Sequence, residues 1–469
     1  MAGAFASGWL TVVDLTESER ALADATRAHR WWEPLPVRHT DITDPPQDAD
    51  WGDERTVRAQ VLYQLLTGGW LPTVGEADWD IAPRAVRVRG ARIVGQLDLE
   101  AATLRCPLQL EGCWLDHDAA PVLLREVTAP AIRIRGCWLP AGLDARQVTT
   151  RGDVDLQRCR VQGEVRLLGG HVGGQLRLSG GKFRNAGGTA LAADGLQVDH
   201  SVFCREGFEA DGEVRLIGGH VGGQMDLSGG MFRNAGGTAL NAERVRVNGS
   251  LSWLPEEVTG RVSFAFGSVG VWADSVNALD TPVVLDRLQY DAVFPGPPEV
   301  TAARRVAWLN RDPDGYSPQP YSQLAAVYRT EGHDRAARQV LVASQARRRR
   351  QRSGWRGWAG RTWGGLLWAT AGYGYRPWLA LLWLAALIVG GALVVDWLPQ
   401  RDFARASGAP TFNALLYTLD VLLPFIDLGY SKWVAVSAAQ VVTVVLVVLG
   451  WVLATAVIAA FAGVLRRGD

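Results

Sequence analysis

The chain contains the stretch GEVRLLGGHVGGQLRLSGGKFRNAGGTAL at residues 163–191 and repeats it almost unchanged as GEVRLIGGHVGGQMDLSGGMFRNAGGTAL at residues 212–240. The second copy begins 49 residues after the first. Four positions differ between the copies: Leu168/Ile217, Leu176/Met225, Arg177/Asp226 and Lys182/Met231. Such a repeat is either a duplicated functional site or a lengthened structural wall, and the spacing of its apolar residues helps to decide between them.

The repeat is built from units of 11 residues, each with two alternating apolar residues, a corner of small residues and one further apolar residue. In the unit that begins at Gly163, these are Val165 and Leu167, Gly169-Gly170, and Val172. The alternation predicts short strands, and the glycines predict turns. Because no helices intervene, we expect a mainly β chain with a parallel β-solenoid over residues 84–298, for which a right hand is favoured.

Two units would form a flattened coil of about 22 residues, so the 49-residue repeat corresponds to two coils plus a surface loop, RNAGGTAL. The near-identity of the copies is then more typical of a wall lengthened by duplication than of a doubled active site. The side chains predicted to point inward are Val165, Leu167, Val172, Leu176, Leu178 and Phe183, with their copies Val214, Leu216, Val221, Met225, Leu227 and Phe232.

The histidines and cysteines of the solenoid are interpreted as structural or surface residues. His171 and His220 would lie two coils apart, about 10 Å from each other, which is too far for both to ligate one metal ion. Corner positions account for three of the five cysteines, and the absence of a C-x-x-C pair argues against a zinc site or a disulfide framework. We therefore predict no metal, no cofactor and no catalytic residue.

Helical segments are expected on both sides of the solenoid. Residues 1–83 contain the capping-box pattern Thr16-Glu-Ser-Glu19 and a helical spacing that ends at Gly68-Gly69, which predicts a helical cap over the open end of the solenoid. Residues 299–352 predict an antiparallel helical hairpin that turns at Gly332 and acts as a linker.

The last part of the chain has the composition of a membrane module. Residues 353–376 are rich in arginine and tryptophan, and residues 377–469 contain two long apolar stretches, Pro377–Leu398 and Trp433–Val464, each long enough to cross a bilayer. Basic residues precede the first stretch and follow the second, so both ends and the solenoid are expected on the cytoplasmic side of the plasma membrane. The residues predicted to contact anionic lipid headgroups are Arg347, Arg348, Arg349, Arg350, Trp355 and Trp358.

The segment 411–430 between the two apolar stretches is apolar but interrupted. It contains Asp420, Pro424 and Asp427 and is followed by Gly429-Tyr430, which predicts a re-entrant helix that needs protein around it and therefore favours a homo-oligomer. A carboxylate at membrane depth marks a pathway or a subunit contact. The alternative is that both aspartates cap short helices at the level of the headgroups.

Several blocks in a fixed order resemble a known family. WGDERTVRAQVL, the G-x-V-x-L-x-G-x-x-V-G-G units, DPDGYSPQPYSQLAAVYR, GYGYRPW and FNALLYTLDVLLPFIDLG are similar to actinobacterial proteins usually labelled membrane-associated oxidoreductases. That resemblance implies a membrane-bound redox enzyme but names no cofactor, and GYGYRP lacks the third glycine of a dinucleotide fingerprint. The C-terminal third also resembles two-span channel-like proteins with a pore loop, although Leu428-Gly429-Tyr430-Ser431 departs from a potassium filter.

Three functions therefore remain open. A membrane-anchored scaffold or sensor with an unidentified protein partner on the solenoid face comes first, an oligomeric channel or channel-derived sensor second, and an oxidoreductase third. The chain has 48 basic and 48 acidic residues, so its overall charge does not favour a nucleic-acid partner.

Overall fold

The structure is a computed structural model. It describes residues 15–34, 51–68, 84–274, 281–295, 300–351, 377–405, 407, 410–422 and 428–465. The chain divides into two compact units, Met1–Val340 and Leu341–Asp469. Each unit is described by itself.

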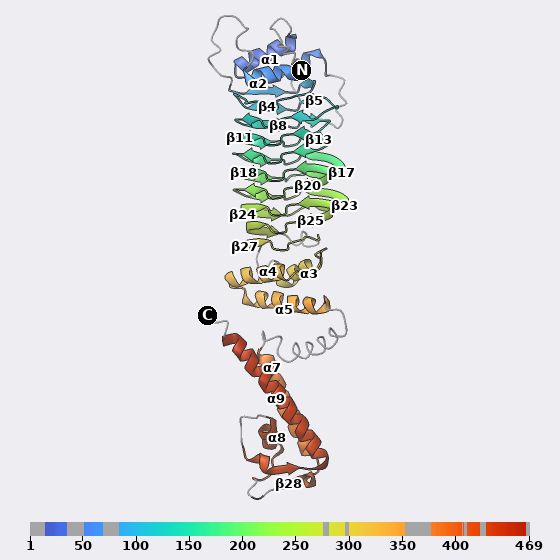
Figure 1. Ribbon diagram of the computed structural model, residues 1–469, viewed down its shortest axis with the longest axis vertical. Coiled ribbons are helices and arrows are strands. Elements are labelled where there is room, and N and C mark those ends of the chain that lie inside the picture. Colours follow the sequence, from blue (N-terminus) through green and yellow to red (C-terminus); the bar gives the residue numbers. More distant parts are fainter. Residues whose placement is uncertain are drawn as a thin grey trace, which may run out of the picture. The chain divides into compact units, whose positions relative to one another are not determined.

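The first unit is built around a parallel β-solenoid of about nine turns, as the sequence predicts (Figure 1). Each early coil has four short strand positions, so one 11-residue unit supplies two of them. Val154 pairs with Leu176, and Leu143 with Val165, which gives the predicted step of 22 residues per coil. Parallel pairing places the same position of every coil in one column, so side chains of one column lie above one another.

The strands of the solenoid form two sheets, with 12 and 15 strands. The first sheet contains β1 (Thr56–Arg58), β3 (Arg92–Val94), β5 (Trp114–Asp116), β6 (Val122–Leu123), β9 (Trp138–Leu139), β10 (Leu143–Asp144), β13 (Arg160–Gln162), β14 (Val165–Arg166), β17 (Lys182–Ala192), β20 (Glu209–Arg215), β23 (Met231–Asn241) and β25 (Glu257–Ser263). The second contains β2 (Val86–Arg89), β4 (Leu108–Glu111), β7 (Thr128–Ala129), β8 (Ile132–Arg135), β11 (Thr149–Thr150), β12 (Val154–Asp155), β15 (His171–Val172), β16 (Leu176–Arg177), β18 (Gln197–Val198), β19 (Val202–Phe203), β21 (His220–Val221), β22 (Met225–Asp226), β24 (Arg246–Trp253), β26 (Ser268–Asp274) and β27 (Gln289–Phe294).

The interior of the solenoid is packed with the predicted residues. All twelve side chains expected to point inward are buried. A column of aromatic rings fills the lower part of the core, with neighbouring ring centroids 5.2 to 5.9 Å apart. It consists of Phe183, Phe208, Phe232, Trp253, Phe264 and Trp272. Edge-on and tilted ring pairs of this kind add to the burial of apolar area, so the column ties successive coils together.

The RNAGGTAL stretch differs from the predicted loop. It belongs to the long strands β17 and β23, which bulge outward from the coil, and Asn185 closes the first bulge by donating from Nδ2 to the carbonyl oxygen of Thr189 at 2.8 Å. Because Leu176 pairs with Val202 and Val202 with Met225, the two coils of the repeat take 26 and 23 residues. The extra residues therefore extend the strands of one coil, and the backbone pairing continues on both sides of the bulge.

The N-terminal cap is helical with one addition. Helix α1 (Glu17–Arg27) begins with the predicted capping box, and α2 (Ala59–Thr67) ends at Gly68 in the left-handed conformation. The turn η2 (Asp53–Arg55) precedes α2, and residues Thr56–Arg58, expected to be helical, instead form β1 and pair with β3. The cap thus joins the first coil through backbone hydrogen bonds as well as through packing.

The other end of the solenoid is closed by α3 (Ala302–Leu309) and α4 (Pro318–Thr330), beneath which α5 (Asp334–Gln351) follows. The predicted hairpin is confirmed for α4 and α5, which turn at Gly332, but α3 precedes them. Helix α4 covers the last strand: Gln319 and Gln323 donate from Nε2 to the carbonyl oxygens of Leu288 and Tyr290 at 3.0 and 2.7 Å. An open edge of a sheet can pair with another chain, and α4 occupies that edge.

A buried ion pair fixes α3 to the solenoid. Arg305 donates from Nη2 to Oδ1 of Asp274 at 2.8 Å and from Nη1 to the hydroxyl of Tyr328 at 3.0 Å. Burial raises the pKa of Asp274, and the hydrogen bonds from Arg305 oppose that shift. The ring of Trp308 extends the aromatic column onto α3, 6.2 Å from Trp272.

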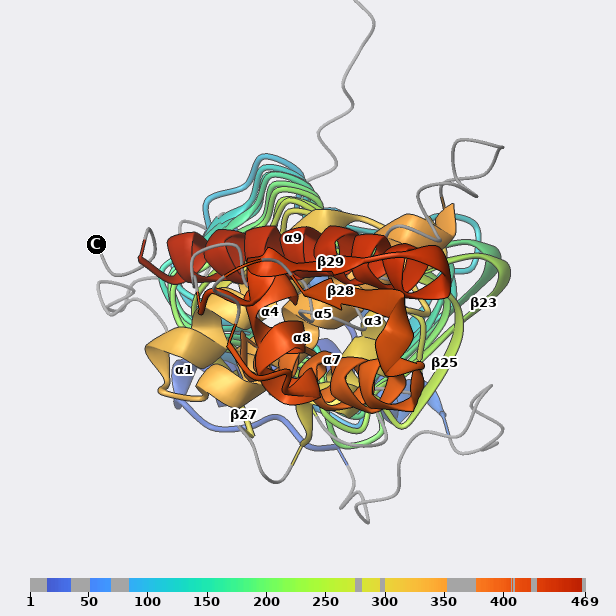
Figure 2. The same ribbon diagram turned by 90° about the horizontal axis from the view of Figure 1, so that it is seen from below.

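The second unit contains α7 (Pro377–Trp397), η5 (Gln400–Asp402), β28 (Phe403–Arg405), α8 (Ala414–Leu422), η6 (Tyr430–Lys432), β29 (Trp433–Ala435) and α9 (Ser437–Leu465). Strands β28 and β29 pair antiparallel, and α7, α8 and α9 pack against one another (Figure 2). In the described part of the chain, no helix meets the length and apolarity that a membrane crossing requires. The two predicted spans thus remain predictions.

Candidate functional site

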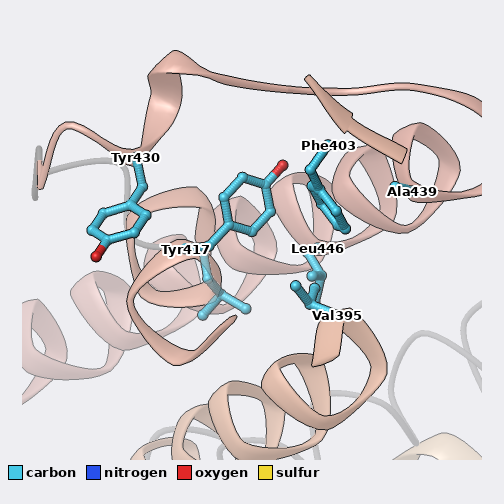
Figure 3. Packing of buried hydrophobic residues seen from close by; sticks show 7 residues of the cluster. Val395, Phe403, Tyr417, Tyr430, Ala439 and Leu446 are labelled. Carbon is cyan, nitrogen blue, oxygen red and sulfur yellow. The ribbon is translucent and has the colours of Figure 1, made fainter. Parts of the chain in front are cut away.

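The second unit is organised around one small hydrophobic cluster. Its buried members are Val395, Phe403, Tyr417, Leu422, Tyr430, Ala439 and Leu446. Figure 3 shows the ring of Tyr417 between Tyr430 on one side and Phe403 on the other. The Tyr417 hydroxyl lies 3.0 Å from Oγ1 of Thr443, so this polar tip has a partner within the cluster. All three helices and the β28–β29 hairpin contribute to this core.

Helix α8 reaches this position because glycines leave room for it. A Cβ atom at Gly450 on α9 would lie 2.1 Å from the carbonyl oxygen of Leu422, and one at Gly391 on α7 would lie 2.8 Å from Cγ2 of Thr418. No real Cβ atom approaches backbone so closely, and α8 therefore lies between two helices at distances that only glycine permits. Small residues at close helix contacts are typical of helices that pack without water.

The predicted site residues of segment 411–430 are brought together only in part. Asp420 is half-buried near the end of α8, and its Oδ1 accepts a hydrogen bond from the backbone N–H of Leu428. Gly429 follows with a left-handed φ of 77°. The buried Tyr430 donates from its hydroxyl to the carbonyl oxygen of Thr411 at 3.1 Å. Among the described atoms, Asp420 thus holds the start and the end of the predicted re-entrant segment together. Pro424 and Asp427 lie outside the described residues.

The outer surfaces of α7 and α9 carry large apolar side chains. On α7, Leu393 is 66% and Trp397 is 88% exposed, and on α9, Val441 is 65% exposed. The other exposed apolar residues of these two helices are Val389, Val394, Val444, Val445, Val448, Leu449 and Trp451. A helix that is apolar on every side is stable either in a large protein core or in lipid.

The β28–β29 hairpin presents a second kind of surface. The guanidinium carbon of Arg405 lies 5.9 Å from the ring centre of Trp433, whose Nε1 donates to the carbonyl oxygen of Pro410 at 3.2 Å. Phe412 packs against Trp433 with ring centres 5.2 Å apart. The sequence analysis missed this pair, although the alternation in WVA next to an aromatic belt was a usable signal. An arginine on a tryptophan whose N–H is satisfied is suited to the boundary between lipid and water.

The predicted headgroup contacts are also placed in part. Arg347, Arg348, Arg349 and Arg350 lie in the last turns of α5, and Arg348 and Arg350 are exposed. Cationic side chains near a helix C-terminus interact favourably with the helix dipole, so part of this pattern has a structural cause. Trp355 and Trp358 lie outside the described residues.

The histidines and cysteines of the solenoid occupy the positions predicted for them. His171 lies on the outer surface and its Nε2 is 3.0 Å from Oδ1 of Asp199, while His220 lies two strands further along the same column. All five cysteines are free and buried. Burial raises the pKa of Cys159 and of Cys204 to about 12. Within the described residues, no group of histidine, cysteine, aspartate and glutamate side chains could hold a metal ion.

Comparison with known proteins adds no assignment. No family model, curated protein or solved structure matches this chain.

Proposed function

We propose that this protein is a non-enzymatic, membrane-anchored β-solenoid that serves as a scaffold or sensor on the cytoplasmic side of the plasma membrane. One observation carries the proposal: the second unit buries a small core and leaves a much larger apolar surface on α7 and α9 uncovered. Contiguous apolar surface on this scale marks a contact with a membrane or with another protein.

The arrangement of charge supports lipid as that contact. The uncovered side chains of α7 and α9 are apolar, whereas Arg405 and Trp433 lie together at the hairpin and the four arginines lie at the end of α5. Cationic and amphipathic aromatic side chains at the margins of apolar surface are suited to phospholipid headgroups. We infer that anionic lipids are the preferred partners of this unit.

The solenoid supports the scaffold part of the proposal. Among the described residues, its outer charges are largely arranged as ion pairs, such as Arg233 with Glu209 at 2.7 Å and with Glu257 at 2.6 Å. Repeating coils with a regular, neutralised outer surface suit the binding of a partner along their length.

A second candidate, an oligomeric channel or channel-derived sensor, is favoured by one specific observation. Helix α8 lies between α7 and α9 at glycine contacts, as a re-entrant segment would, and its Asp420 would then lie at membrane depth. A homo-oligomer belongs to this candidate. The oxidoreductase that the resemblance implies is the third, and no described side chain supports it.

The test is membrane binding by the full-length chain. Vesicles containing anionic lipid are floated on a density gradient, and pellets are then extracted with alkaline carbonate. We expect the wild-type chain to float and to resist extraction. A variant in which Val441, Val445 and Val448 become serine should be extracted more easily. A matched variant with serine at the exposed Thr128, Thr149 and Gln197 of the solenoid should behave as wild type.

Two results would overturn or reorder these candidates. A wild-type chain that remains soluble without detergent and does not float would remove the membrane anchor. Ion flux through vesicles that Asp420→Asn alters, while insertion stays intact, would place the channel ahead of the scaffold.

A further inference from the structure

One corner of the solenoid repeats in every coil and requires an unusual backbone conformation. At this corner the residue has a positive φ, and its N–H donates to the equivalent turn of the next coil. In successive coils the position is held by Gly169, Gly195, Gly218, Arg244, Phe266 and Arg287. Glycine adopts this conformation without steric cost, whereas a bulky side chain rarely does so.

Phe266 is the exception in this column. It has φ 61°, and 48% of its surface is exposed, so the ring is not there to fill the core. A side chain at this corner points outward: a Cβ atom built at Gly195 or Gly218 would meet no atom within 4 Å. Strained residues persist in folded proteins mainly where surrounding structure and function require them.

The surroundings of Phe266 are basic. The guanidinium carbon of Arg287 lies 5.2 Å from the centre of the Phe266 ring, and Arg244 occupies the same corner in the preceding coil. Arg246 lies two residues beyond Arg244, at the start of β24, where it pairs in register with Ser268. Within the described part of the chain, no carboxylate forms an ion pair with Arg244 or Arg246.

This lack of ion pairs distinguishes the corner from most of the wall above it. Arg166 lies 2.7 Å from Glu164, and Arg135 lies 2.5 Å from Asp155. Of the three arginines around Phe266, Arg287 alone has a carboxylate nearby, with its Nε 4.0 Å from Oδ2 of Asp286. A half-exposed aromatic ring among arginines with little neutralisation has the composition of a binding hot spot.

We propose that Phe266, Arg244, Arg246 and Arg287 form a docking surface for an acidic protein segment that carries an aromatic or aliphatic side chain. The carboxylates of the partner would pair with the arginines, and its apolar side chain would lie on the exposed ring. The surface lies on the side of the solenoid at the turn before β26, one coil above α4 (Figure 1). The inference gives the proposed scaffold a class of partner and rests on that function only for its biological meaning.

The test uses the full-length chain in detergent, so that it does not depend on membrane insertion. An array of random peptides is probed with wild type, with Phe266→Gly, with the double variant Arg244→Gln/Arg246→Gln and with Arg151→Gln. Arg151 is a matched control, because it is exposed on an earlier coil of the same sheet. We expect wild type and the control to select acidic peptides with an apolar residue, and the other two variants to bind those peptides at least tenfold more weakly.

The substitution at Phe266 separates binding from folding. Glycine is the residue that other coils use at this corner, so Phe266→Gly should keep or raise the Tm while binding is lost. A lower Tm with unchanged peptide binding would make the ring a structural element and overturn the inference. Selection of peptides without acidic residues, or no selection by wild type, would also overturn it. So would loss of binding to vesicles of anionic lipid in the Phe266→Gly variant, with no effect on peptides.

Discussion

The two units of this protein place their apolar side chains in opposite ways. In the solenoid, Val165, Leu167 and their equivalents point into the coil, and the outer surface carries ion pairs and polar turns. In the second unit, a few side chains around Tyr417 are buried, while α7 and α9 direct valines, leucines and tryptophans outward. The solenoid therefore suits water as its solvent, and the second unit suits a less polar one.

The difference extends to how backbone groups are satisfied. In the solenoid, each coil donates to and accepts from its neighbours, and only the first and last coils have open edges, which β1 and α4 cover. In the second unit, the helices satisfy most of their own backbone groups. A substitution in the solenoid core should thus propagate along the coils, and one in the second unit should act on the packing of a single helix.

The largest effect is expected inside the wall. Leu167→Asp places a charge among buried apolar residues without a partner and should lower the free energy of unfolding by several kcal/mol, on the order of 4 or more. Thermal unfolding followed by circular dichroism at β-sheet wavelengths measures it. His171→Ala, four residues away on the outer surface, should change it by less than about 0.5 kcal/mol. A larger loss from His171→Ala than from Leu167→Asp would contradict the assignment of the two faces.

The second effect is expected at the end of the solenoid. Arg305→Met removes one partner of a buried ion pair and should cost about 3 to 5 kcal/mol, because Asp274 would remain charged and buried. The neighbouring exposed Arg304→Met serves as the control.

The pH dependence of that loss is a separate check. Burial raises the pKa of Asp274 in the folded chain, and removing Arg305 removes the groups that oppose this shift. A raised folded-state pKa means that stability falls as the pH rises through the carboxyl range. The deficit of Arg305→Met should thus be smaller near pH 4 than at pH 7, and urea unfolding at the two pH values tests it. An equal deficit at both pH values would argue that packing, and not the unpaired charge, carries the loss.

The third effect tests the second unit. Gly450→Ala would bring a methyl group against the carbonyl oxygen of Leu422 and should displace α8, at a cost of about 1 to 3 kcal/mol. Gly390→Ala on α7 is a close control, since a Cβ atom there meets nothing within 4 Å. Thermal unfolding in detergent, followed by tryptophan fluorescence, compares the two. Equal Tm values for both variants would show that α8 does not pack at this glycine.

Local pattern was sufficient to predict the wall but not what closes it. The inward residues could be predicted because alternation and glycine corners are properties of a few neighbouring residues. The role of Gln319 and Gln323 could not, because it depends on where α4 meets the backbone of β27. The additional helix α3 was missed although Thr301 caps it, since its buried face includes the charged Arg305.

The candidate site shows the same limit. The sequence placed Asp420 in an interrupted apolar segment, and the structure gives it a local partner, the N–H of Leu428. That contact fits the alternative in which the aspartate caps a helix end, and it does not by itself exclude a position on an oligomer axis. The exposed Phe266 gave no signal in the sequence, because only the folded coil reveals that it occupies a corner elsewhere held by glycine.

The smallest effect concerns the first cap, where a charged group is buried in the solenoid unit. The side chain of Glu19 is 1% exposed and accepts hydrogen bonds from Nε and Nη2 of Arg58 at 2.8 and 2.6 Å. Burial acts to raise the pKa of Glu19, but the hydrogen bonds from Arg58 and from the backbone N–H of Thr16 outweigh it, so the pKa is lowered below its usual 4.5. A lowered folded-state pKa means that its stabilising contribution is complete well above pH 4.5 and is lost as the pH falls through the folded-state value. Hydrogen exchange of the α1 amides between pH 3 and pH 6 should therefore show an opening of the cap at low pH, once corrected for the intrinsic exchange rate. Glu19→Gln should remove this pH dependence, whereas Glu17→Gln, at an exposed position of the same first turn, should retain it. If both variants retain it equally, acid weakens the cap through other carboxylates, and the buried pair does not distinguish the capped end from the rest of the wall.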